Sequence, residues 1–483
     1  MNRRLIFKSI GSILRIEALL MLFPLVVSLI YGGGDYWAFL WSILITFAAG
    51  MLLASIKPKN RNFRTRDAFV VAGLSWFLFS LFGALPFLFS GCFNSFIDCV
   101  FEAVSGFTTT GASVLTSVEG LPKGILFWRS FSHWVGGMGI LMFMMAALPS
   151  INASSVNLLR AESTGPSPDK IVPKIRQTAR ILYMIYIALT VLLIVFLIIS
   201  GLPVYDSLIN AFSTAGTGGF SSLNASIGGY NSLAAEIVIT IFMFLFGVNF
   251  SLYFLIFDRK FSRFIRDAEL KVYFGVVAAA IIIIAINISG LYGGFANALR
   301  HSSFQVSSII STTGYATADF NLWPTLSKVI LVFLMASGCC AGSTGGGIKL
   351  IRFIILFKAV KIELGKIFHP GRIDAVSING KRISRDIVSR TALFFFVYFA
   401  FFILSVILVS IDGHDIVTST TSVIASLSNI GPGLGTIGPA GNYSAFSPFS
   451  KIVLSFCMIA GRLEFFPVLV LFVPSVWKKG LIK

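Results

Sequence analysis

Charged residues are scarce in this chain of 483 residues. Asp, Glu, Lys and Arg together make up 12% of the sequence, whereas hydrophobic residues make up 56%. Soluble domains usually carry about 25% charged residues, and a soluble fold could not bury this much apolar side-chain surface. The composition therefore excludes an ordinary soluble protein and predicts an integral membrane protein.

Histidine and cysteine are also few, with four and five copies. The cysteines have no metal-ligand spacing and form no dense disulfide framework. Cys92 and Cys99 could form a bridge, but free buried thiols are favoured, and a redox role for Cys339 and Cys340 stays open. Because no nucleophile–base pair or metal cluster stands out, the sequence offers no catalytic residue and no covalent cofactor, and it argues against a membrane enzyme.

The net charge of +18 comes from basic residues that follow a pattern along the chain. The two termini and the segments 57–66, 160–180, 259–271 and 349–390 hold 32 of the 38 Lys and Arg residues. An excess of Lys and Arg in alternate loops is typical of the cytoplasmic side of a polytopic membrane protein. We therefore expect both termini in the cytoplasm, a basic face toward anionic lipid, and no nucleic-acid partner.

The apolar stretches predict ten membrane-spanning helices, because a span needs about 20 apolar residues. The eighth is unusual, since its middle reads SGCCAGSTGGG (337–347) and glycines weaken a helix. The predicted spans cover 12–31, 36–56, 68–90, 124–148, 179–201, 233–256, 271–290, 326–356, 389–411 and 450–474.

Four loops between the later spans share one pattern, a short apolar segment followed by a run of Ser, Thr and Gly. Aligning them on one glycine each brings Ser105, Ser213, Ser308 and Ala425 six positions before their glycines. In the second loop Gly218 could replace Gly219 in this alignment. A unit of span, short helix, glycine loop and span therefore occurs four times, after two helices that stand outside the repeat. The aligned glycines are Gly111, Gly219, Gly314 and Gly431.

Such a repeat indicates an ion pore. A dozen apolar residues cannot cross a bilayer, so each short helix is re-entrant or interfacial. Irregular backbone at membrane depth survives only inside protein or beside water. Four such loops around one axis can point main-chain carbonyls at a cation, and glycine supplies the positive φ that this requires. No charged side chain lies in the four residues before any aligned glycine.

At these residues the chain resembles the Trk/Ktr/HKT superfamily of potassium transporters, and within it the bacterial TrkH type. The resemblance covers nearly the whole chain. None of the four loops carries the full TVGYG of potassium channels, a departure that weakens a claim of strict K⁺ selection. The motifs that carry the resemblance are SGFTTTGAS, GGFSS, STTGYATADF, SNIGPGLG, HWVGGMGI and AGRLEFFPVLVLF.

The resemblance implies K⁺ uptake through a pseudo-fourfold pore made by one chain in the bacterial inner membrane. It also implies a homodimer and a cytosolic nucleotide-binding regulatory subunit of the TrkA type. It makes the glycine-rich break, with Gly345, Gly346 and Gly347, a gate that Arg462 faces. The filter residues that bind K⁺ would be Thr109, Thr110, Gly111, Thr217, Gly218, Gly219, Thr312, Thr313, Gly314, Asn429, Ile430 and Gly431.

The resulting fold class is an all-α polytopic membrane protein with two N-terminal helices and four pseudo-symmetric helix–pore-helix–helix repeats around a central pore. A Na⁺- or H⁺-coupled secondary transporter is the alternative function, because such proteins also use broken helices. Scarce titratable residues within the spans argue against it. The expected units are 1–66, then repeats at 67–150, 176–257, 271–358 and 389–477.

A few charged residues within the apolar segments have competing interpretations. An Arg at mid-span should face protein or water, so Arg462 either lines the gate or pairs with Glu464, and two residues apart on a helix is poor geometry for a pair. Arg129 could equally snorkel to the interface or serve a function, and His133 is expected to be packed. Negative charge near a helix N-terminus is favourable, which explains Asp98, Asp206 and Asp415, with cation attraction as an extra role.

Two glycine motifs are discounted. Gly433, Gly435 and Gly438 match G-x-G-x-x-G, but Pro439 follows where a dinucleotide site needs a helix. GSTGGGIK (342–349) resembles a phosphate loop, but Ile348 separates the last glycine from Lys349 within an apolar span.

Overall fold

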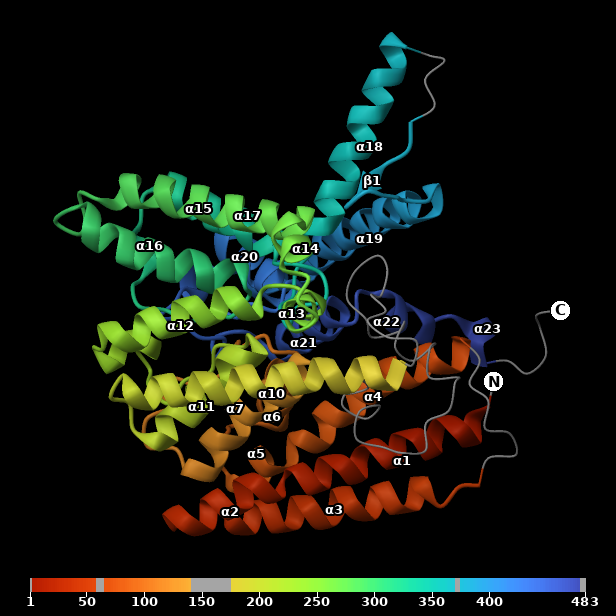
Figure 1. The fold of residues 1–483 in the computed structure, drawn as a ribbon. Coiled ribbons are helices and arrows are strands. Elements are labelled where there is room, and N and C mark those ends of the chain that lie inside the picture. The colour runs from red at the N-terminus through yellow and green to blue at the C-terminus, as the bar shows by residue number, and fades with distance from the viewer. Residues whose placement is uncertain (1, 58–64, 140–174, 370–373, 478–483) are drawn as a thin grey trace.

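The structure is a computed structural model that describes residues 2–57, 65–139, 175–369 and 374–477. The described chain is almost wholly helical, as the sequence predicts. In Figure 1 the long helices run side by side across the molecule, while α18 (Leu350–Phe368) projects away from them.

The N-terminal unit contains α1 (Arg3–Leu20), α2 (Leu22–Tyr31) and α3 (Tyr36–Ala54). α1 and α2 together form one apolar span of 29 residues, and α3 packs along α1. The contact is close because it uses glycines, as is common between membrane helices. A Cβ added to Gly11 would lie 2.7 Å from the carbonyl oxygen of Gly50.

The first two repeats follow the order that the sequence predicts, with a long helix, a short helix and a second long segment. The first repeat has α4 (Thr65–Gly83), α5 (Leu85–Ser90), α6 (Phe96–Phe107) and α7 (Lys123–Gly137). The second has α10 (Ile175–Ile199), α11 (Val204–Gly216), the 3₁₀ turn η2 (Ser226–Tyr230), α12 (Leu233–Phe246), α13 (Phe250–Phe257) and α14 (Phe261–Arg266).

The last two repeats are joined by α18 and a small hairpin of β1 (Ser377–Ile378) and β2 (Lys381–Arg382). The third repeat has α15 (Ala268–Ile288), α16 (Phe295–Ile310), η3 (Phe320–Leu322) and α17 (Thr325–Ser337). The fourth has α19 (Arg385–Val409), η4 (Ser410–Asp412), α20 (Ile416–Leu427), η5 (Gly435–Ile437), α21 (Pro448–Arg462), α22 (Phe466–Leu471) and α23 (Pro474–Trp477).

The second long segment of each repeat ends early, after 13 to 15 helical residues. Unbroken spans over 233–256 and 450–474 were therefore a wrong prediction. α12 and α13 meet at 96°, and α21 stops at Arg462, before two residues with positive φ. The eighth span breaks at its glycines as predicted, and residues 140–148 of the fourth lie outside the described ranges. Within those ranges six helices are long and apolar enough to cross a membrane, or seven if the bent pair counts as one.

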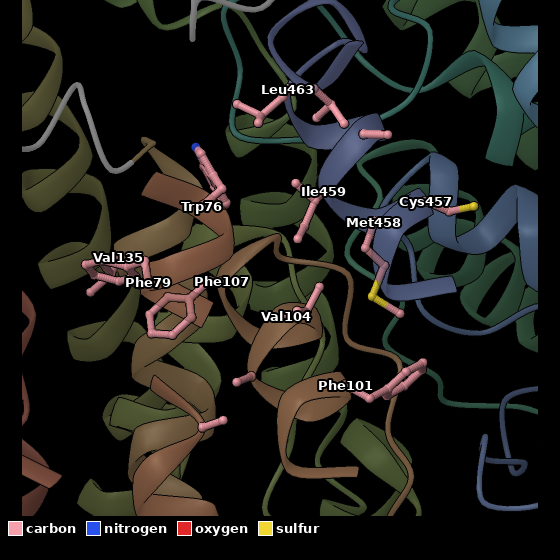
Figure 2. Packing of buried hydrophobic residues seen from close by; sticks show 14 of the residues in the cluster. Trp76, Phe79, Phe101, Val104, Phe107, Val135, Cys457, Met458, Ile459 and Leu463 are labelled. Atoms are coloured by element: carbon pink, nitrogen blue, oxygen red, sulfur yellow. The ribbon is translucent and has the colours of Figure 1, made fainter. Parts of the chain in front are cut away.

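Two large apolar clusters form the core. One joins the N-terminal unit to the first and fourth repeats, and the other joins the second and third repeats. Figure 2 shows part of the first cluster, where Phe107 of α6 meets Phe79 of α4 with ring centroids 4.6 Å apart. In the same view Met458 and Ile459 of α21 lie near Val104 of α6. The first and last repeats therefore share one core, although they are far apart in the sequence.

Candidate functional site

The four short helices begin at the loops and end deep inside the protein. α6 is capped by the hydroxyl of Ser95, which accepts from the Asp98 amide at 3.1 Å, and α20 by Asp415, which accepts from the Thr418 amide at 3.2 Å. Their last turns are buried. Each helix therefore directs the negative end of its dipole into the protein interior, where it favours a cation.

All four helices end in the same backbone turn. Two residues before each aligned glycine, a residue other than glycine adopts a left-handed conformation with φ between 55° and 60°. The glycine itself has φ between 76° and 94°, a conformation that costs glycine little. The first position holds Thr109, Thr217, Thr312 and Asn429, and the second holds Gly111, Gly219, Gly314 and Gly431.

One hydrogen bond fixes the register of the turns. The amide just before each aligned glycine donates to the carbonyl six positions before that glycine, at 2.8–2.9 Å. In the second repeat the donor is Gly218, so the geometry pairs Gly219, and not Gly218, with the other three glycines. The four donor–acceptor pairs are Thr110–Ser105, Gly218–Ser213, Thr313–Ser308 and Ile430–Ala425.

The four turns meet one another in a closed cycle. Each aligned glycine faces the carbonyl of the residue that precedes the glycine of the following repeat. Cβ atoms added at these glycines would lie between 1.8 and 2.7 Å from those oxygens, so only glycine permits the approach. The contacts run from Gly111 to Gly218, from Gly219 to Thr313, from Gly314 to Ile430 and from Gly431 back to Thr110.

Because the fourth contact returns to the first repeat, the turns surround a single axis. We call the carbonyl groups of Thr110, Gly218, Thr313 and Ile430 the carbonyl ring. Buried side chains brace it. The hydroxyls of Thr108 and Thr110 lie 2.8 Å apart, and the side-chain amide of Asn429 donates to the Thr110 hydroxyl at 3.0 Å. These bonds hold the turns in place in the absence of regular secondary structure.

All four aligned glycines also line one open-sided cavity of about 150 Å³. The loops that leave the turns form its other walls. Tyr443 from one of these loops donates its hydroxyl to the Gly431 carbonyl at 2.7 Å, and its amide donates to the Ser113 carbonyl at 2.8 Å. The cavity is therefore a vestibule above the ring.

Arg129 lines this vestibule as well, but it is 2% exposed. Its guanidinium forms an ion pair with Glu102 of α6 at 2.7 Å, donates to the Ser113 hydroxyl at 3.2 Å and stacks over Phe220. The interpretation that Arg129 snorkels to the lipid interface is therefore wrong. Its charge is needed inside, because Glu102 is fully buried on the pore-side helix of the first repeat.

The glycine-rich loop, residues 338–349, lies on the other side of the ring. The Gly346 amide donates to the Thr312 hydroxyl at 2.7 Å, and a Cβ on Gly346 would meet the Ser428 carbonyl oxygen at 2.2 Å. A Cβ on Gly345 would lie 2.7 Å from the Ser311 carbonyl oxygen. The loop is thus packed against the ends of α16 and α20, opposite the vestibule.

Arg462 connects this loop to the first repeat. Its guanidinium donates to the Thr344 carbonyl at 2.7 Å and to the carbonyls of Gly136 and Gly137 at 2.5 and 2.6 Å. Gly136 and Gly137 are the last two residues of α7, so one cation bridges the C-terminal end of α7 and the glycine-rich loop. Glu464 forms an ion pair with Arg352 of α18.

Two aspartates at the short helices have structural partners. Asp98 binds the Lys451 ammonium at 2.7 Å, and Asp206 accepts from the Ser222 hydroxyl at 2.6 Å. His133 is fully buried and packed as predicted, with Nδ1 2.7 Å from the Gly106 carbonyl oxygen. Within the described ranges no group of three His, Cys, Asp or Glu side chains could hold a metal ion.

Sequence reasoning missed Glu102, Tyr443 and the acceptors of Arg462. Glu102 carried a usable signal, because a carboxylate in the middle of the apolar segment FIDCVFEAVSGF requires a buried partner. Tyr443 and Gly136 carried none, since their partners depend on how distant loops meet.

Comparisons with known proteins identify the family of the chain. A family model described as TrkH, cation transport protein, matches residues 37–479. The chain belongs to the TrkH family. The TrkH family consists of membrane transport proteins, so the chain is a transporter and not an enzyme.

Relatives of this TrkH-family chain match it end to end. The Trk system potassium uptake protein TrkH of Halomonas elongata is 36% identical over 99% of this chain and 100% of the relative, and that of Escherichia coli K12 is 35% identical with the same coverage. The crystal structure of the potassium transporter TrkH from Vibrio parahaemolyticus superimposes with a TM-score of 0.89 at 30% identity, covering 99% of this chain and all of that one.

Proposed function

We propose that this chain takes up K⁺ through the carbonyl ring, down the electrochemical gradient. The closed cycle from Gly111 through the four repeats back to Thr110 is the observation that supports the proposal most strongly. Four main-chain oxygens at one axis can replace the hydration shell of an alkali cation. The end-to-end relatives named as potassium uptake proteins support K⁺ as the ion.

The filter in this proposal is formed by the three residues that end at each aligned glycine. It selects by carbonyl dipoles, because no charged side chain is part of it. The dipoles of four short helices add a favourable field for the ion. The proposed K⁺-binding residues are Thr109–Gly111, Thr217–Gly219, Thr312–Gly314 and Asn429–Gly431.

The glycine-rich loop is the proposed gate. Gly345 and Gly346 touch residues at the inner end of the filter, and Arg462 ties Thr344 to the opposite side of the axis. A guanidinium held there repels a passing cation, and release of the loop would remove both the obstruction and the charge.

Replacement of Gly314 by Ser tests the filter. At φ 82° a Cβ would lie 2.0 Å from the Ile430 carbonyl oxygen, so the ring must distort and discrimination between K⁺ and Na⁺ should fall. The matched control is Gly413→Ser, because Gly413 also has positive φ (77°) but has open space around its Cβ position. K⁺ and Na⁺ flux into proteoliposomes is the measurement, and unchanged selectivity in Gly314→Ser would count against the filter.

The coupled-transporter alternative predicts a different reversal potential. A pore reverses at the K⁺ equilibrium potential whatever the Na⁺ or H⁺ gradient, whereas a symporter reverses at a potential that both gradients set. Currents recorded under crossed gradients separate the two.

We further infer that both termini lie in the cytoplasm of a bacterial cell whose inner membrane holds the chain. The Arg3 guanidinium donates to the Trp477 carbonyl at 2.9 Å, so the start of α1 lies beside the end of α23 (Figure 1). From the family resemblance we also propose a homodimer and a TrkA-type cytosolic subunit. Light scattering of the purified protein and co-purification with such a subunit test these two proposals.

A further inference from the structure

A single buried carboxylate holds both ends of the proposed gate. Glu269, the second residue of α15, is 6% exposed. Its Oε1 accepts from the Ala341 amide at 2.8 Å and from the Ile351 amide at 3.0 Å. Residues 342–350, which include most of the glycine-rich loop, are therefore enclosed between Ala341 and Ile351, whose amides meet at one oxygen atom.

The same loop has internal bonds that let it behave as one unit. Lys349 is 1% exposed and donates its ammonium to the Gly345 carbonyl. The hydroxyls and thiols at its start are also bonded, with the Ser343 hydroxyl donating to the Cys340 carbonyl at 2.6 Å. Fixing the two ends therefore goes far toward fixing the whole loop.

The position of Glu269 is in turn set from outside the membrane-spanning region. The residue before α15, Asp267, caps the helix by accepting from the Leu270 amide at 2.9 Å. Asn379, at the tip of the β1–β2 hairpin, accepts from the Ala268 amide at 2.9 Å and donates to Asp267 at 2.6 Å. The hairpin tip is thus bonded to the first turn of the helix that carries Glu269.

We propose that Glu269 is a positioning residue for the gate, and that the hairpin tip sets its place through Asn379. The inference rests on the proposed function of the glycine-rich loop. Its physical basis is the cost of a buried carboxylate, which is tolerated only where hydrogen bonds compensate it. Here the compensation comes from the two amides that bracket the loop, so moving the start of α15 moves both ends of the loop together.

The chain carries its own reporters for this movement. Cys339 and Cys340 lie in the glycine-rich loop and are fully buried, as is Cys457 in α21. A water-soluble maleimide reacts with a thiol only when it becomes accessible. Peptide-resolved mass spectrometry of the intact, detergent-solubilised protein gives a separate labelling rate for each cysteine, with Cys457 as the internal control for general loosening.

In Glu269→Ala both amides lose their acceptor, and labelling of Cys339 and Cys340 should accelerate about tenfold or more, the factor that corresponds to about one charge-assisted hydrogen bond. The labelling rate of Cys457 should stay constant. Glu269→Gln keeps one acceptor oxygen and should restore most of the protection. Glu363→Ala is the matched control, because Glu363 is exposed on α18 and bonds only to Lys366 among the contacts described.

Asn379→Gly tests the hairpin arm without straining the turn, since Asn379 has φ 50° and glycine adopts it freely. We expect the labelling rates of Cys339 and Cys340, and not that of Cys457, to rise by less than in Glu269→Ala. The Asn379→Gly variant also tests the inference if gel filtration shows that Glu269→Ala does not fold.

The inference would be overturned if Cys339 and Cys340 label at the wild-type rate in a folded Glu269→Ala variant. It would also be overturned if the labelling rate of Cys457 rises as much as theirs. If Glu269→Ala cannot be purified, Cys339 and Cys340 that label at the wild-type rate in Asn379→Gly would overturn the inference. K⁺ flux measured on the same wild-type preparation keeps the two claims apart. Absent flux would refute the proposed function, whereas the labelling rates report on the loop itself.

Discussion

The Arg462 guanidinium donates a hydrogen bond of 2.7 Å to the Thr344 carbonyl, which joins the end of α21 to the middle of the glycine-rich loop. Arg462 is 7% exposed. A cation held this way beside the ring both fixes the loop and adds a positive charge to the proposed ion path.

Replacing Arg462 by Gln should increase basal K⁺ flux about tenfold or more, because two unit charges 4 Å apart repel by about 4 kcal/mol at an effective dielectric constant near 20. Arg462→Lys keeps the charge but loses the forked guanidinium that reaches both Thr344 and Gly137. The K⁺ flux of Arg462→Lys should therefore lie between that of the wild-type protein and that of Arg462→Gln. Proteoliposome flux in the absence of any partner protein is the measurement. Flux that falls in both variants would contradict the gate.

Breaking the Glu102–Arg129 pair should destabilise the protein. Either Glu102→Leu or Arg129→Met alone leaves an unpaired buried charge, which costs about 3–5 kcal/mol. The double variant removes both charges and should recover a large part of that loss. Thermal unfolding in detergent tests this, and additive losses in the double variant would show that the two residues do not act as a pair.

Tyr443→Phe should weaken the filter without unfolding the protein. The change removes the hydroxyl that donates to the Gly431 carbonyl, a bond worth about 1 kcal/mol. We expect K⁺ over Na⁺ selectivity to fall by less than tenfold. Tyr253→Phe is the control, because its hydroxyl donates to the Leu245 carbonyl at 2.6 Å, outside the ring. An equal loss in the control would rule out a specific effect.

Two helical glycines should respond oppositely to alanine. A Cβ on Gly136 would lie 1.8 Å from the Phe107 carbonyl oxygen, whereas a Cβ on Gly275 meets nothing within 4 Å. Gly136→Ala should therefore lower the unfolding temperature sharply. Gly275→Ala should leave it unchanged or raise it slightly, since alanine is favoured over glycine in a helix by about 1 kcal/mol. Similar shifts in both variants would contradict the close approach of α7 to α6.

The sequence predicted the parts of this fold that repeat. Each aligned glycine, such as Gly111 or Gly314, supplies the positive φ that lets its loop point main-chain carbonyls at one axis. The pattern was visible because it occurs four times at matched places. The same reasoning could not foresee the left-handed Thr109, because a β-branched residue rarely adopts that conformation unless tertiary contacts impose it.

The breaks after α12 and α21 were hidden for a related reason. FMFLFGVNFSLYF is mostly apolar and carries no charge, so its hydropathy predicts one continuous span where Gly247 and Asn249 turn the chain. The eighth span was recognised as broken because its glycines cluster. Pairings over long distances, such as Arg462 with Gly136, depend on how the repeats meet and leave no trace in local composition.

The carbonyl ring has four contributors of three residue types, Thr110, Gly218, Thr313 and Ile430, encoded at separate places in one gene product. In an assembly of four identical chains any substitution is copied into every quadrant at once. In the proposed filter a single substitution alters one quarter of the carbonyl ring, so natural variation could adjust the affinity for the ion in small, independent steps.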